Sequence, residues 1–126
     1  MGAVTVYLPL AVDTVVKGFT NASYQQRITI TPPSPSQPIV FTGSGESNKQ
    51  IGSAHFTTPS SWPDPLGYPI DVKLEYSTGG GNWNASDIFT GSCTIQAYNL
   101  TVVVSEDGID GDWNDGVCMI SWPQVG

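Results

Sequence analysis

The chain has 126 residues, of which 39% are hydrophobic and only 12% charged, and its formal net charge is −7. A chain of this length folds as one domain with a substantial core, so we expect a single domain over residues 1–126. Four basic residues against eleven acids cannot form a basic patch for a phosphate backbone, which excludes nucleic acid as a partner.

Short runs rich in Val, Ile, Thr, Tyr and Phe recur along the chain with turn residues between them, whereas helical periodicity is almost absent. The predicted strands are Thr5–Leu8, Thr14–Thr20, Gln26–Thr31, Ile39–Thr42, Gln50–Thr57, Ile70–Tyr76, Thr94–Val104 and Gly116–Trp122. Residues 27–31 and 71–76 alternate between apolar and polar side chains, as strands covering one side of a core do. We therefore expect an all-β fold, an antiparallel, Greek-key-like β-sandwich of about nine strands.

Three segments interrupt the strand pattern: Pro32–Pro38, Pro59–Pro69 and Thr78–Ser92. Prolines in the first two cannot donate to a strand ladder, so both are connections. The third contains three consecutive glycines and Trp83, and is predicted to be a long surface loop. We favour a Trp83 that folds back over the sandwich edge, with contact to a ligand as the alternative.

An acidic run lies between two nearly continuous apolar runs, Leu100–Val104 and Val117–Ile120. It holds five of the eleven acids within ten residues: Glu106, Asp107, Asp110, Asp112 and Asp115. The apolar runs are predicted to be central strands buried on both faces, which makes the acidic run a loop between them.

Oxygen-bearing side chains at positions 106, 110, 112, 114 and 115 of a glycine-containing loop suit Ca²⁺, which takes six to eight oxygen ligands in flexible geometry. The glycine placement and flanking strands do not fit an EF-hand. Five carboxylates also exceed what one ion needs, so two calcium ions fit better. The alternatives are a solvated acidic turn and a glycosidase that uses two of the carboxylates, although no pair stands out as acid and base.

The histidine and cysteines offer little sign of catalysis. His55 lies in a predicted strand, and no Ser-His-Asp or Cys-His constellation can be assembled around it. Cys93 and Cys118 either form a disulfide or remain free thiols, and the sequence leaves both open.

Several motifs resemble the small bacterial two-calcium lectins that bind L-fucose and D-mannose, known from Pseudomonas aeruginosa, Burkholderia and Ralstonia. The resemblance is strongest at Val104–Gly108, Asp110, Asp112, Asn114–Asp115 and Trp122–Pro123. It is weaker at Leu8–Pro9, Gly18–Ala22 and Phe41–Gly45.

The resemblance implies a lectin that binds mannose- or fucose-containing glycans and has no enzymatic activity. The calcium ligands it implies are Asn21, Glu106, Asp110, Asp112, Asn114, Asp115 and, from a neighbouring subunit of a homodimer, the terminal carboxylate of Gly126. The sugar-binding residues it implies are Ala22, Ser23, Tyr24, Asp107, Gly108, Asp110, Asp112, Asn114 and Asp115. Ala22 implies a preference for mannose, because family members with serine there favour fucose.

The remaining alternative is a β-sandwich in which calcium is purely structural and no sugar binds.

No apolar stretch approaches the ~20 residues that span a bilayer, and no cationic leader precedes an apolar segment. We therefore expect a soluble protein that acts outside the cell or at its surface after non-classical export.

Overall fold

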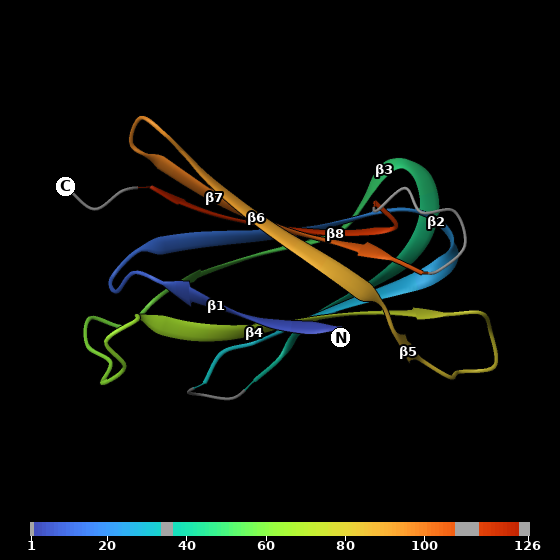
Figure 1. Ribbon diagram of the computed structural model, residues 1–126, viewed down its shortest axis with the longest axis horizontal. Coiled ribbons are helices and arrows are strands. Elements are labelled where there is room, and N and C mark those ends of the chain that lie inside the picture. Colours follow the sequence, from blue (N-terminus) through green and yellow to red (C-terminus); the bar gives the residue numbers. More distant parts are fainter. Residues whose placement is uncertain (1, 34–36, 108–113, 124–126) are drawn as a thin grey trace.

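The computed structural model describes residues 2–33, 37–107 and 114–123, and its regular structure is entirely β. The strands are β1 (Ala3–Leu8), β2 (Asp13–Thr31), β3 (Ile39–Thr57), β4 (Tyr68–Ser77), β5 (Asn84–Ala85), β6 (Asp87–Ile95), β7 (Tyr98–Glu106) and β8 (Gly116–Pro123). All pairings are antiparallel, in the order β1-β4-β2-β8-β7-β6, with β3 also on β2 and β5 on β4. The predicted all-β sandwich is confirmed (Figure 1).

Two long bent strands connect the layers of the sandwich. The first half of β2 pairs with β8, and its second half pairs with β4. Strand β3 follows β2 through the bend, where the register shifts at three points between Gly18 and Gln26. Each bent strand was predicted as two separate strands, because the bend contains polar residues and glycines that resemble a loop. The bend lies at the same end of the sandwich as the start of β8 (Figure 1).

The hairpin of β6 and β7 corrects two sequence predictions. Residues 94–104 were predicted as one strand, but a turn at residues 96–97 separates β6 from β7, and Gln96 adopts a φ of 54°. Likewise, residues 78–92 were predicted to be a loop, but they contain β5 and the first part of β6. Strand β6 is short of apolar residues and is exposed along nearly all of its length, so it lacks the pattern of a strand that covers a core.

The core lies between the two layers and is built from side chains of β1, β2, β3, β4, β7 and β8, together with Val12 just before β2. Its buried members are Val6, Leu8, Val12, Val16, Ile28, Ile30, Phe41, Tyr68, Ile70, Val72, Leu74, Val103, Cys118, Ile120 and Trp122. Strands β7 and β8 were predicted to be buried on both faces, but buried and half-buried residues alternate along them. The outer faces of these strands carry half-buried apolar residues such as Val102 and Met119.

The two cysteines are free: Cys93 is exposed on β6, and Cys118 is buried on β8. No helix among the described residues is long and apolar enough to cross a membrane.

Candidate metal and ligand-binding site

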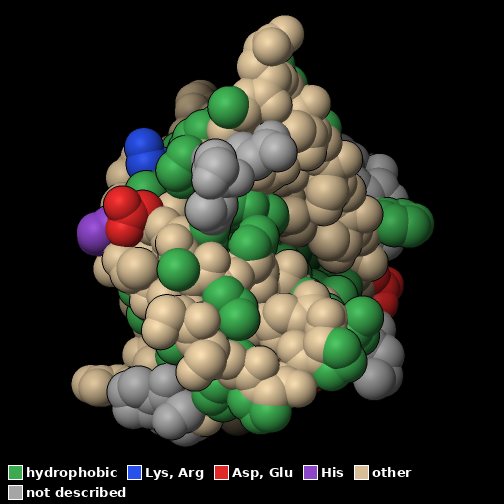
Figure 2. All heavy atoms as spheres, turned by 90° about the vertical axis from the view of Figure 1, so that its left-hand side faces the viewer, with side chains coloured by type: hydrophobic (Ala, Val, Ile, Leu, Met, Phe, Trp, Pro, Cys, Tyr) green, Lys and Arg blue, Asp and Glu red, His purple; other side chains and the backbone are tan. Residues whose placement is uncertain are grey.

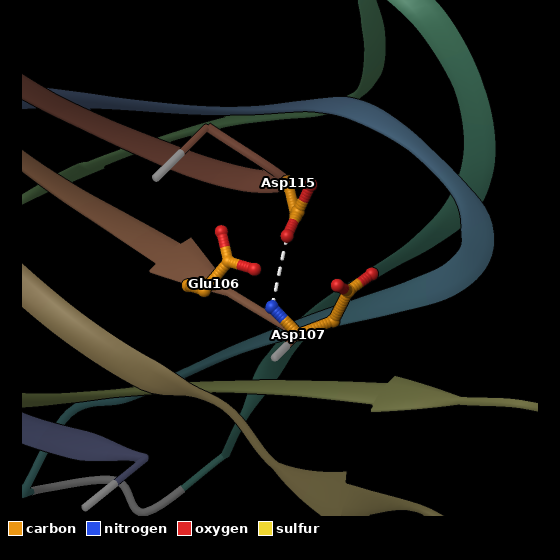
Figure 3. A group of neighbouring side chains, drawn as sticks. All are labelled: Glu106, Asp107 and Asp115. Atoms are coloured by element: carbon orange, nitrogen blue, oxygen red, sulfur yellow. Dashed lines mark hydrogen bonds between the residues drawn. The ribbon is translucent and has the colours of Figure 1, made fainter. Parts of the chain in front are cut away.

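Three buried carboxylates meet where β7 ends and β8 begins. Glu106 is the last residue of β7, Asp107 follows it, and Asp115 directly precedes β8. One carboxylate oxygen from each lies within 4.8 Å of the other two. Their residues are only 5%, 8% and 2% exposed, respectively. Paired antiparallel strands bring the two ends of the acidic run together, so the pairing of β7 with β8 builds this cluster (Figure 3).

Asp115 is fixed by backbone hydrogen bonds from both sides. Its Oδ2 accepts a hydrogen bond of 2.8 Å from the Asp107 N–H. Its own N–H donates to the Ser105 carbonyl at 3.0 Å, and its carbonyl accepts from the Asn21 N–H at 3.0 Å. The carboxylate therefore has a defined direction before any ligand binds.

Burial raises the pKa of the Asp115 carboxyl to about 7. The hydrogen bond from the Asp107 backbone opposes this shift, whereas the negative charges of Asp107 and Glu106 add to it. A buried carboxylate next to two others is costly to ionise unless an opposite charge is present. The cluster is thus arranged to favour a bound cation.

Asn21 connects this cluster to the bend of β2 and β3. Its Nδ2 donates to the Asn114 carbonyl at 3.1 Å, on the same segment as Asp115. Its Oδ1 accepts a hydrogen bond from the backbone N–H of Asn48 in the bend of β3. Ser47 and Asn48 adopt left-handed φ values of 67° and 55°, which turn the strand back toward Asn21. Two distant segments thus hold Asn21 beside the acidic cluster.

Ser105 and Gly116 form the floor of the cluster. The Gly116 N–H donates to Ser105 Oγ at 2.9 Å, and the hydroxyl donates back to the Gly116 carbonyl at 3.3 Å. A Cβ at Gly116 would lie 2.7 Å from Ser105 Oγ and 3.3 Å from Gln26 Oε1. Glycine is therefore required here by close packing.

The residues implied to contact sugar follow Asn21 along β2. Ala22 is buried, Ser23 is exposed, and Tyr24 is half-buried. The Tyr24 ring stacks on Tyr76 of β4, with ring centroids 6.1 Å apart and planes 18° apart. These residues border the site from the β2 side, whereas Asp107 borders it from the β7 side.

The predicted site is only partly within the described residues. Glu106, Asn114, Asp115 and Asn21 lie close together, while Gly108, Asp110, Asp112 and Gly126 lie outside the described residues. Asp107, which was predicted only as a sugar contact, lies close enough to Glu106 and Asp115 to share a cation with them. The strand positions around Asn48 were missed, because only the fold brings residue 48 next to residue 21.

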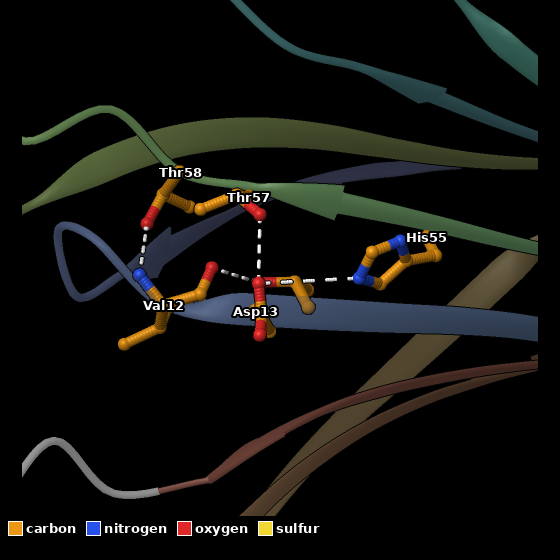
Figure 4. A network of polar contacts seen from close by, with 6 residues as sticks. Val12, Asp13, His55, Thr57 and Thr58 are labelled. Carbon is orange, nitrogen blue, oxygen red and sulfur yellow. Dashed lines mark hydrogen bonds and ion pairs between the residues drawn. The ribbon is translucent and has the colours of Figure 1, made fainter.

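A second polar cluster lies where β2 begins and β3 ends (Figure 4). Asp13 Oδ1 accepts a 2.7 Å hydrogen bond from the Thr57 hydroxyl and lies 4.0 Å from His55 Nε2. The His55 side chain is 64% exposed, and the Thr57 hydroxyl contacts the aspartate, which leaves no activated nucleophile in this group. The end of the sandwich that Figure 2 faces carries only scattered charged side chains among its described atoms. This cluster therefore ties two strands together and is no catalytic site.

The donor set of the acidic cluster fits a hard cation. The described side chains that converge there offer carboxylate oxygens, and oxygen ligands of this kind select calcium or magnesium over softer metals. Calcium tolerates more ligands and less regular geometry than magnesium, which suits carboxylates from two strand ends and a loop. The arrangement can therefore hold a cation at the surface of the sandwich, beside a rim of polar and aromatic side chains.

Comparison with known proteins adds independent information about this site. Residues 6–124 match the sequence model of a family described as fucose-binding lectin II (PA-IIL). The chain is similar to the high-affinity mannose-binding lectin of Ralstonia solanacearum, with a TM-score of 0.71 and 30% identity, covering 97% of this chain and 96% of that one. It is similar also to a Chromobacterium violaceum lectin in complex with α-methyl-fucoside, with a TM-score of 0.70, 26% identity and the same coverage of both chains.

The C-terminal domain of a Burkholderia cenocepacia lectin shares the fold, with a TM-score of 0.68, 24% identity, and coverage of 97% of this chain and 96% of that one. No curated protein sequence matches the chain.

Proposed function

The chain belongs to the fucose-binding lectin II (PA-IIL) family, and we propose that it is a calcium-dependent lectin that prefers D-mannose and also binds L-fucose. Members of the family are carbohydrate-binding lectins without enzymatic activity, so the glycosidase alternative is excluded. The observation that carries the calcium proposal is the cluster of three buried carboxylates at the junction of β7 and β8.

We propose that two calcium ions bind in this region. Asn21, Glu106, Asp110, Asp112, Asn114 and Asp115 are the proposed ligands from this chain. When bound, the ions would supply positive charge to which neighbouring hydroxyls of one sugar ring coordinate. The Asp115 carboxylate is buried and held by a hydrogen bond, which supports this proposal. A ligand that is already ordered loses less conformational entropy when the ion binds.

The chain's own residues would orient the sugar. Asp107 is close enough to accept hydrogen bonds from hydroxyls at the site, and charged acceptors form the stronger hydrogen bonds to such groups. Ser23 and Tyr24 are proposed to line the opposite rim, with Ala22 beneath them. Gly108 completes the proposed rim on the β7 side.

We further propose that the chain forms a homodimer in which the Gly126 carboxylate enters the neighbour's site. Strand β8 starts beside Asp115 and runs to the opposite end of the sandwich (Figure 1). Its eight residues extend about 26 Å, whereas the three residues after Pro123 reach at most about 11 Å. If Gly126 supplies a ligand, that ligand therefore goes to another copy. The edge strand β6, on which Phe89 is 63% and Ile95 70% exposed, also supports association.

The first test is retention on immobilised mannose. We expect the protein to bind the resin in millimolar calcium and to elute with EDTA, because removal of the ions removes the charge that holds the sugar. Calcium binding is measured in parallel by calorimetry. A protein that binds calcium yet flows through both mannose and fucose resins would be a structural calcium module instead.

The second test addresses specificity at Ala22. We expect Ala22→Ser to shift the ratio of mannose to fucose affinity toward fucose by on the order of fivefold, the effect of one additional hydrogen bond. The shift is measured by titrating methyl α-mannoside and methyl α-fucoside. Ala85→Ser, at an exposed position of β5, adds the same hydroxyl away from the site and should leave the ratio unchanged. An unchanged ratio in Ala22→Ser would remove this residue from the specificity determinants.

A further inference from the structure

A hollow of about 280 Å³ lies beside the proposed sugar site, between the bend of β2 and the end of β4. Its lining comes from two short segments, Ser23–Gln25 and Ser77–Gly79. Ser23 and Tyr24 are also rim residues of the proposed calcium site. The hollow thus shares two residues of β2 with that rim.

We propose that this hollow is a second subsite, which binds the neutral hexose next to the calcium-bound sugar in an oligosaccharide. The proposal rests on the proposed lectin function and extends it from single sugars to glycans of at least two residues. Its volume lies near the lower end of small-molecule pockets, which suits a single sugar ring. Tyr24 lies three positions after Asn21 along the strand, which corresponds to at most about 10 Å. That separation suits adjacent sugar rings.

The chemistry of the lining matches a carbohydrate. The Tyr24 ring is half-buried and held in place by its stack on Tyr76, so it offers a fixed aromatic wall. Fixed aromatic rings bury the apolar C–H face of a ligand at low entropic cost. Gln25 and Thr78 are exposed and supply amide and hydroxyl groups for ring hydroxyls. Among the described residues, no Asp, Glu, Lys, Arg or His lines the hollow, which favours a neutral hexose over an acidic sugar.

The loop that forms the far wall is fixed in place. The Gly79 N–H donates to Ser77 Oγ at 3.1 Å, and Ser77 is buried. Gly79, Gly80 and Gly81 all adopt φ values between 71° and 126°, which glycine reaches without strain. A Cβ at Gly79 or Gly81 would meet nothing within 4 Å, so these glycines serve the backbone path of the loop.

The end of the same loop is anchored on the outer face of the sheet. The Arg27 guanidinium carbon lies 4.3 Å from the ring centroid of Trp83. The Nε and Nη2 atoms of Arg27 both lie 2.9 Å from Glu75 Oε1. Trp83 therefore folds back onto the sandwich, as predicted, and contributes no surface to the hollow. The hydrogen bond between Gly79 and Ser77 holds the start of this loop, and the contact of Trp83 with Arg27 holds its end. The two contacts together preserve the shape of the hollow.

The test compares a monosaccharide with its disaccharides. Calorimetry on the full chain in calcium measures methyl α-mannoside and the α1-2, α1-3 and α1-6 mannobioses. At least one mannobiose should bind about five- to tenfold more tightly than methyl α-mannoside, the effect of one aromatic contact with one hydrogen bond. Thr78→Trp fills the hollow and should abolish this advantage while leaving methyl α-mannoside affinity unchanged. Ser61→Trp introduces the same side chain at an exposed position in the loop between β3 and β4 and should preserve both affinities.

The outcomes separate the two proposals. If methyl α-mannoside binds but no mannobiose binds more tightly, the subsite is refuted while the lectin function stands. If Thr78→Trp keeps the full disaccharide advantage, the added ring is elsewhere and the hollow is refuted as its location. If neither methyl α-mannoside nor methyl α-fucoside binds in calcium, the lectin proposal itself fails.

Discussion

Asp115→Asn is expected to abolish sugar binding and calcium-induced stabilisation without unfolding the chain. Asn keeps an oxygen that can accept the Asp107 N–H hydrogen bond, so the local backbone should survive. The substitution removes a negative charge from a cluster that is 2–8% exposed, and the affinity for a divalent cation should fall at least a hundredfold. Wild-type protein should gain about 2.7 kcal/mol of unfolding free energy at a calcium concentration one hundred times Kd, and the variant should gain almost none.

Measurements in EDTA distinguish a cation ligand from an ordinary structural acid. The folded-state pKa of Asp115, about 7, lies above its unfolded value, so the folded chain binds the proton more tightly. Wild-type stability in EDTA should therefore fall as pH rises from about 4 to about 7. Asp115→Asn lacks this titration, so it should be at least as stable as wild type at pH 7.5, and the two should converge at about pH 4, near the unfolded pKa of an aspartate.

The control for Asp115→Asn is Asp13→Asn, at an aspartate whose side chain is 70% exposed. This substitution removes the same charge at the other end of the chain's long strands and should leave calcium and sugar binding unchanged. If Asp115→Asn retains calcium-dependent sugar binding, Asp115 is not a ligand and the cluster has another role.

The sandwich could be predicted because its core-facing strands carry the period of two that burial on one side imposes. Burial alternates along residues 27–31 and 71–74 as the apolar pattern of the sequence does, whereas Glu75 is buried and Tyr76 is half-buried. The acidic run could also be predicted as a loop between two strands, because apolar runs lie on either side of it. That pairing of β7 with β8 is what brings Glu106 and Asp115 together.

Other features depended on contacts that no local pattern records. The turn at residues 96–97 has no glycine, proline or asparagine in its two positions, so a hairpin was predicted as one strand. Strand β6 is exposed on both faces and has no periodicity to detect. The interaction of Asn21 with Asn48 joins positions 27 residues apart through a bend whose polar residues resemble a loop.

At the proposed rim, residue identity alone does not predict how a side chain is held in place. Tyr24 was predicted as a rim residue from its place after Asn21, but its role depends on Tyr76, which lies 52 positions later and holds the ring by stacking. The register that places Gln26 opposite Tyr76 creates this pair. Pairing of β2 with β4 therefore shapes the proposed rim.

Gly116→Ala is expected to destabilise the fold and weaken calcium binding together, because Gly116 forms the floor under Asp115. The new methyl group would lie 2.7 Å from Ser105 Oγ, so the hydroxyl must move and both of its hydrogen bonds with Gly116 are lost. Overpacking and lost buried hydrogen bonds should together lower the unfolding free energy by about 2–4 kcal/mol. Calcium affinity should fall at least tenfold, since Asp115 moves with its neighbour. Chemical denaturation in EDTA and calcium calorimetry measure the two effects.

Gly91→Ala is the matched control, because a Cβ at Gly91 on β6 would meet nothing within 4 Å. It should leave calcium affinity unchanged and raise the unfolding free energy by up to about 1 kcal/mol, because alanine lowers the entropy of the unfolded chain. Adding Ser105→Ala to Gly116→Ala removes the clashing oxygen and should restore part of the lost stability, by the non-additivity expected of residues in contact. If the double variant is no more stable than Gly116→Ala alone, the clash with Ser105 is not the cause. If Gly116→Ala binds calcium as wild type does, the floor of the cluster does not position Asp115.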